Sequence, residues 1–273
     1  MIVQSAPEGE PSFVITMADH MAFAGRLGEA FGNDRFEPVD PRELMLYVIS
    51  NHDAGWMPID ELAEIDPTKG LPYNLIETPF DDRIHTTSGS PNYNAKHHPY
   101  CELMASMHTW GLYHGRFGLS DIVTLDLVDL DHRPRLEKVL DGEKERQEMP
   151  RAELANDPES APWVVEDHLF QNYKQLQFFD TLSLYFHRSG EGMRGDETFP
   201  HVPLTASADL DVTVTPVGEG TYAFSPFSFR KDGIEFSFTG RWMSPQPDWP
   251  ESSLAGLLQS IPAVEQTVRL VAA

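Results

Sequence analysis

The longest predicted helix, over residues 162–189, carries a carboxylate on its apolar face. The residues that recur there at helical spacing are Leu169, Tyr173, Leu176, Asp180 and Leu184. An ionised carboxylate in such a stripe is costly unless it is paired, hydrogen-bonded or bound to a metal ion. A helix edge at which Asp180 reaches water or an arginine is the alternative explanation, and residue type alone does not separate the two.

Two earlier helices are predicted to carry a histidine on the apolar face. The first begins at Thr16 and ends at Gly32, with His20 on the same face as Phe23 and Leu27. The second begins at Asp40 as N-cap with Pro41 as first residue, and it brings His52 to the inner face. A single buried histidine is more often a hydrogen-bonded core residue than a ligand. Neither histidine alone therefore indicates a metal site, but the two histidines together with Asp180 do.

The rest of the chain divides into a helical part and a part rich in strands. A helix over residues 99–111 presents His108, residues 57–94 are predicted to be mostly loop, and the charged residues 133–154 an exposed helix. After Gly190 the pattern changes to alternating strands, a short helix and a final strand. These are predicted over residues 211–215, 222–229, 234–242, 252–259 and 264–271. Lys231-Asp232-Gly233 predicts a hairpin between the second and third strands.

We therefore predict a mainly α fold. A helical domain would span residues 1–190, and a small antiparallel sheet over residues 191–273 would pack on it as a C-terminal extension.

Histidine and carboxylate side chains on facing helices are typical of a metal site inside a helical core. The candidate ligands are His20, His52, Asp53, His108 and Asp180. Imidazole with carboxylate suits zinc, iron or manganese better than calcium, which takes oxygen ligands only. One divalent metal ion is predicted, and a second is left open.

The order of these residues resembles a known family. The segments ADHMAFAGRL, VISNHDAGW, ASMHTWGLYHG and LQFFDTLSLY carry a histidine, a His-Asp doublet and a distant aspartate. This order is similar to that of the HD superfamily of metal-dependent phosphohydrolases, and most similar to an uncharacterised branch of it known only as a domain of unknown function. The resemblance implies an HD-type helical bundle, with His20, His52, Asp53 and Asp180 as metal ligands.

Several members of that superfamily add two histidines and bind two metal ions. The candidates here are His85, His97, His98, His108 and His114. His108 is the first choice because its helix faces the core. His97 and His98 are expected to cap a helix, and His114 to lie on the surface.

The resemblance implies a metal-dependent hydrolase acting on a phosphoester of a small molecule or nucleotide. Asp53 would orient the attacking water, and His108 would act as a ligand or general acid. Residues assigned to substrate binding on weaker grounds are Trp56, Tyr73, Arg83 and His85. The alternatives are a di-iron oxygenase resembling myo-inositol oxygenase, and a non-enzymatic metal-stabilised sensor or scaffold.

The charge of the chain limits its partners. Its 43 acidic and 20 basic residues give a net charge of −23, which disfavours nucleic acid and anionic membranes. A small-molecule substrate fits better. A single cysteine, Cys101, and the lack of a long apolar run predict a cytoplasmic protein. The oligomeric state is left open.

Overall fold

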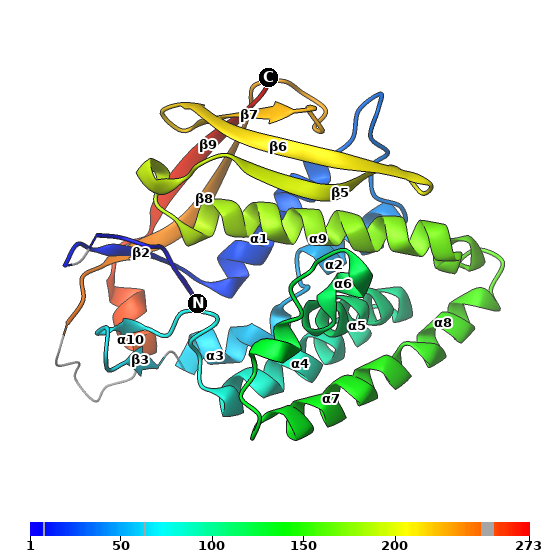
Figure 1. Cartoon of the computed structure of the whole chain (residues 1–273), viewed down its shortest axis with the longest axis horizontal. Helices are drawn as coiled ribbons and strands as arrows, with labels where there is room; N and C mark the ends of the chain where they lie inside the picture. The colour runs from blue at the N-terminus through cyan, green and yellow to red at the C-terminus, as the bar shows by residue number, and fades with distance from the viewer. Residues whose placement is uncertain (8, 63, 247–253) are drawn as a thin grey trace.

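The structure is a computed structural model that describes residues 1–7, 9–62, 64–246 and 254–273. About 48% of it is helical and 22% is strand, and seven strands form one large curled sheet. The prediction of a mainly α fold with a small C-terminal antiparallel sheet is therefore wrong: the fold is α/β. Figure 1 shows the sheet on one side, two long helices against it, and the remaining helices beyond them.

The sheet takes strands from both ends of the sequence. Its order is β1-β2-β8-β9-β7-β6-β5. The strands are β1 (Ile2–Val3), β2 (Ser12–Ile15), β5 (Glu197–Thr205), β6 (Ala208–Gly218), β7 (Thr221–Ser225), β8 (Ile234–Met243) and β9 (Val264–Ala272). β2 pairs with β8, placing Phe13 opposite Trp242. The sheet thus joins strands from both sides of the boundary predicted at residue 190.

The hairpin predicted at Lys231-Asp232-Gly233 does not form. β9 lies between the two strands it would join, antiparallel to β8 and parallel to β7. The turn residues indicate a reversal of the chain but do not determine which strand becomes the neighbour. β5 was not predicted, because its register shifts between Phe199 and Val202 and again after Pro203 break the apolar alternation.

The two helices that lie against the sheet are α1 (Met17–Ala30) and α9 (Glu166–Arg188). Thr16 caps α1 by accepting from the Asp19 amide, which confirms the predicted start. The ring of Phe23 on α1 lies 5.3 Å from Phe238 of β8 and 5.8 Å from Phe186 of α9, centroid to centroid. Edge-on aromatic packing of this kind fixes α1 and α9 relative to the sheet.

Most of the remaining helices cover the other side of α1 and α9. The remaining helices are α2 (Arg42–Ile49), α3 (Met57–Leu62), α4 (Phe80–Ala95), α5 (Pro99–Tyr113), α6 (Gly115–Gly118), α7 (Arg133–Arg146), α8 (Glu148–Ala155) and α10 (Leu254–Ser260). Of these, α10 lies against α3. Short 3-10 turns lie at Ala54–Trp56 (η1), Thr124–Leu127 (η2), Ala161–Val164 (η3) and Glu191–Met193 (η4), and β3 (Ile65–Asp66) pairs with β4 (Leu71–Pro72). The first two residues of the helix predicted over 252–259 lie outside the described residues.

Two stretches of this layer differ from the prediction. Residues 133–154 form two helices, and Leu136 and Leu140 of α7 are buried. Residues 57–94 contain α4 rather than mostly loop. Its buried side chains are mostly small or polar, namely Ile84, Thr86, Thr87, Ser90, Pro91 and Asn94. The sequence of α4 therefore lacks the apolar periodicity expected of a buried helix, although α4 packs closely against its neighbours.

Gly55 allows the segment after His52-Asp53 to approach α4. A Cβ added at Gly55 would lie 2.7 Å from both the Ser90 nitrogen and the Thr86 oxygen. These are backbone atoms that cannot rotate away. The close packing of η1 against α4 therefore requires that residue 55 have no side chain.

We expect Gly55→Ala to lower the free energy of unfolding by about 1 to 3 kcal/mol, the usual cost of overpacking. Gly142→Ala is the matched control, because nothing lies within 4 Å of a Cβ there and α7 gains helix propensity. Urea unfolding of both variants measures the difference. Equal stability of the two would contradict the close contact.

Candidate metal centre

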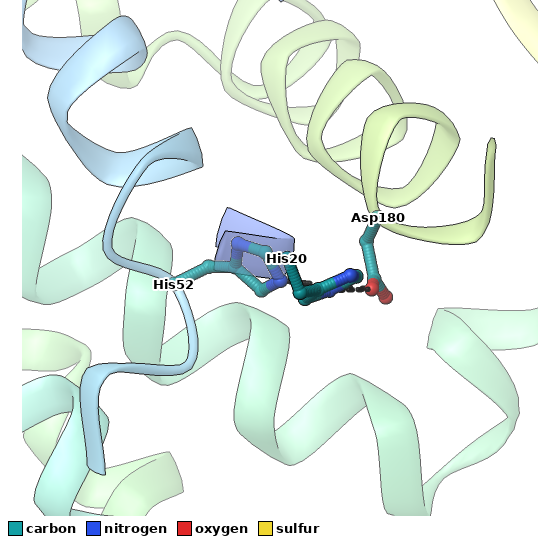
Figure 2. Close-up of side chains that lie close together, drawn as sticks. All are labelled: His20, His52 and Asp180. Atoms are coloured by element: carbon teal, nitrogen blue, oxygen red, sulfur yellow. Dashed lines mark ion pairs between the residues drawn. The ribbon is translucent and has the colours of Figure 1, made fainter. Parts of the chain in front are cut away.

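All five predicted ligands come together between four elements. His20 lies in the first turn of α1, His52 and Asp53 lie in the turn after α2, His108 lies on α5 and Asp180 on α9. Figure 2 shows His20, His52 and Asp180 pointing toward one another. The Oδ1 atom of Asp180 is 3.3 Å from His20 Nε2 and 3.6 Å from His52 Nε2.

A second group of ligand atoms shares His52 with the first. His52 Nε2 lies 3.7 Å from Asp53 Oδ2, and His108 Nε2 lies 3.8 Å from Asp53 Oδ1. Within each group the ligand atoms are within 4.8 Å of one another. The arrangement can hold one metal ion at either group, or two neighbouring ions.

Three buried imidazole nitrogens in this cluster have no hydrogen-bond partner among the described residues. They are the Nε2 atoms of His20, His52 and His108, whose residues are 0% exposed. Buried polar atoms are nearly always satisfied, so three such atoms facing two carboxylates need a physical reason. A cation that accepts their lone pairs supplies one, and the donor set of imidazole and carboxylate fits zinc, iron or manganese.

The opposite nitrogens of two rings are held in a way that leaves Nε2 free. His52 Nδ1 is 2.8 Å from the Ile49 carbonyl, so it donates there and the lone pair resides on Nε2. His20 Nδ1 is 2.8 Å from Ser183 Oγ, which is also 3.3 Å from the His20 carbonyl. The hydroxyl can donate to that carbonyl and accept from Nδ1–H. Such partners fix the tautomer of metal-binding histidines.

The tautomer of His108 depends on one amide. The Gln177 amide lies 2.7 Å from His108 Nδ1 through its nitrogen, and its buried Oε1 has no partner. When the nitrogen donates, the imidazole proton is on Nε2 and faces Asp53. When the amide is turned, Oε1 accepts from Nδ1–H and Nε2 is free to bind a metal.

The surroundings shift the pKa values of the cluster's members in opposite directions. Burial lowers the pKa of His108 to about 3, aided by the charge of His52. Burial also opposes charge on His52, but the carboxylates of Asp53 and Asp180 outweigh it and raise the pKa of His52 to about 9. Burial raises the pKa of Asp53. It acts in the same direction on Asp180, yet the nearby rings of His20 and His52 hold that pKa well below its usual range. Positive charge on His52 is thus one way to neutralise Asp180, and a metal ion is another.

Solvent reaches the cluster at Asp53. Its side chain is 14% exposed, compared with 5% for Asp180 and 0% for His20. Tyr113 of α5 lies within electrostatic reach of Asp53. Burial raises the pKa of Tyr113, while the charge of Arg83 and a hydrogen bond with Thr87 lower it and the charge of Asp53 raises it. Tyr113 and Thr87 were not predicted as neighbours of the cluster.

The weaker substrate candidates lie in different places. Arg83 is on α4 within electrostatic reach of Tyr113, and its Nη1 donates to the Ile76 carbonyl. Trp56 is buried in the main core. Tyr73 lines a pocket with Met1 and Asp60, and His85 is exposed on α4. The four do not line a common pocket, since Tyr73 and His85 line different ones.

The other histidine candidates have structural partners. His97 stacks on Tyr47 with ring centroids 3.6 Å apart, and His98 caps α5 by accepting from the Tyr100 amide. His114 is half-buried and stacks on Trp110, so the expectation of a surface position is only partly right. Among the described residues, neither metal-ligand group includes any of them.

His187 was not predicted and is part of the cluster's surroundings. It is fully buried, and its Nδ1 lies 3.3 Å from His20 Nδ1. Burial and the neighbouring His20 lower the pKa of His187 well below its usual range. The sequence signal was available, since residues seven apart share a helix face and His187 follows Asp180 by that spacing.

Residues 1–244 match the profile of a family described as "Protein of unknown function (DUF3891)". The chain belongs to DUF3891. No curated protein and no solved structure matches the chain. The expected domain of unknown function is thus confirmed, whereas the resemblance of this DUF3891 chain to HD phosphohydrolases stays a prediction. In the described part of the chain, no helix is long and apolar enough to cross a membrane.

We expect His20→Ala, His52→Ala and Asp180→Asn to lose most of the metal found in wild type, since each removes an atom of the same ligand group. His85→Ala is the matched control, because His85 is exposed and outside both groups. Elemental analysis of protein purified without added metal is the measurement. Wild-type metal content in all three ligand variants would exclude the site.

Metal removal is expected to destabilise the wild-type protein. A ligand bound only by the native state contributes about 4 kcal/mol at a thousandfold excess over its Kd. Melting curves before and after chelation, with zinc, manganese or iron(II) added back, measure this. His52→Ala should melt at one temperature in all conditions, and a chelator effect in that variant equal to wild type would contradict binding at this cluster.

Proposed function

We propose that this DUF3891 protein is a metal-dependent hydrolase that acts on a phosphoester of a small molecule or nucleotide. The observation that carries the proposal is the convergence of three imidazole Nε2 atoms, which have no hydrogen-bond partner in the described part of the chain, on the carboxylates of Asp53 and Asp180. The order of these residues along the chain, which resembles that of HD phosphohydrolases, supports the choice of phosphoesters.

The residues that would hold the metal are His20, His52, Asp53 and Asp180, with His108 beside them. A bound metal ion would supply a water of lowered pKa and polarise a phosphoryl oxygen. Because the net charge of the chain is −23, most of its surface would repel an anionic substrate. A bound metal ion would attract that substrate locally.

The roles of Asp53 and His108 follow from their surroundings. Asp53 is the carboxylate nearest solvent, so it is suited to orient the attacking water and to accept its proton. His108 has a pKa of about 3 because it is buried. An imidazole of such low pKa is uncharged at neutral pH, which favours a ligand role for His108 over a general acid role.

The oxygenase alternative has less support. A two-iron site of that kind needs two extra histidines, and among the described residues only His108 joins the ligand groups. A non-enzymatic sensor would bind metal without turnover, so an activity measurement separates it from the hydrolase.

The test is hydrolysis of bis(4-nitrophenyl) phosphate and of nucleoside monophosphates by protein loaded with zinc, manganese or iron(II). We expect Asp53→Asn to lower kcat at least about 100-fold, the usual size of a lost general base. His85→Ala should keep wild-type kcat. Activity that is equal in wild type and Asp53→Asn, or absent with every metal and substrate, would reject the proposal.

A further inference from the structure

A trough runs along the exposed side of α9. It has a volume of about 370 Å³ and lies between α9, the segment 116–122 and β5. Figure 1 shows α9 between β5 and α6. Small-molecule sites begin at about 300 Å³, so the trough is large enough for one. Its apolar lining includes Leu119, Phe178, Leu184 and Phe199.

The charge in the trough is opposite to that of the molecule. Arg116, Lys174 and Arg188 line it, with Glu197 as the one carboxylate among its lining residues, in a chain of net charge −23. Lys174 pairs with Asp209, and Arg188 lies 3.6 Å from Glu197. Arg116 is half-buried, and no described residue forms an ion pair or hydrogen bond with its guanidinium. A half-buried cation without a partner is unusual.

The backbone holds Arg116 in an unfavourable conformation. Arg116 (φ 52°, ψ 45°) and Phe117 (φ 58°, ψ 34°) are consecutive left-handed residues, a region that residues other than glycine rarely adopt. Phe117 packs against Trp110 and Tyr173, with ring centroids 4.8 and 5.0 Å away. This packing offsets the strain, and strain of this kind is often found at ligand sites.

A second polar group in the trough also lacks a partner. Gln177 is only 5% exposed and lines the trough. One end of its amide contacts His108, while the buried Oε1 atom has no hydrogen bond. An amide with one free end, an unpaired guanidinium and an apolar wall together form the elements of a site for an amphipathic anion.

We propose that the trough binds a small organic phosphate, with the phosphate on Arg116 and the apolar part against Leu119 and Phe199. The guanidinium matches phosphate oxygens in a bidentate way. This binding goes beyond the hydrolase function and does not rest on it, because no metal ligand lines the trough. Gln177 lines the trough and contacts His108 through its amide.

The test is calorimetric titration of chelator-treated full-length protein with phenyl phosphate. Wild type should bind it, whereas phenol, which lacks the anion, should not bind. Arg116→Gln should weaken binding about tenfold or more, as expected for a lost charge-assisted hydrogen bond. Arg116→Asn should do the same while tolerating the left-handed backbone. Arg230→Gln, at an exposed arginine outside the trough, should bind like wild type.

The proposal is overturned if wild type does not bind phenyl phosphate, or if both Arg116 variants bind it as wild type does. Benzoate binding more tightly than phenyl phosphate would overturn the assignment to phosphate. If the Arg116 variants do not fold, Arg188→Gln, which removes another positive charge from the trough, takes their place and must also weaken binding. Failure of the hydrolase assay leaves these results unchanged, because all titrations are done without metal.

Discussion

The contact of Asp180 with His20 and His52 is the interaction on which the rest of the structure depends. It joins α9 to α1 and to the turn after α2, at the place where the sheet layer ends and the helical layer begins. Removing one partner from a buried ion pair typically costs about 3–5 kcal/mol. The partners Ile49, Ser183 and Gln177 hold the three histidine rings around this contact, and the proposed metal ion would neutralise the carboxylate between them.

The candidate site was more predictable from the sequence than the fold. His20 and Asp180 stand out because each interrupts an apolar helical stripe, and the doublet His52-Asp53 follows a helix with a clear start. These are local signals, and the structure brings the residues together. Tyr113 and Thr87 were missed because a half-buried tyrosine and a buried threonine have no distinctive spacing. The left-handed backbone at Arg116 leaves no trace in the sequence.

The sheet could not be predicted in the same way. The alternation in β6, β7, β8 and β9 indicates strands, but strand order depends on contacts between residues far apart in sequence. β5 is masked by its bulges, and α4 by a buried face of threonine, serine and asparagine. Neither β5 nor α4 therefore shows the apolar periodicity from which strands and helices are predicted.

The position of β9 affects how the molecule can be assembled during synthesis. β9 follows the other strands of the sheet in the sequence, yet it joins β7 to β8, and β8 in turn pairs with β2 and packs on α1. Such long-range pairings form slowly, and domains fold as their sequence emerges from the ribosome. Until β9 pairs with them, β7 and β8 each keep an unpaired edge. Unpaired edges can accept strands of other chains, so the partly made sheet is exposed to aggregation until β9 takes its place.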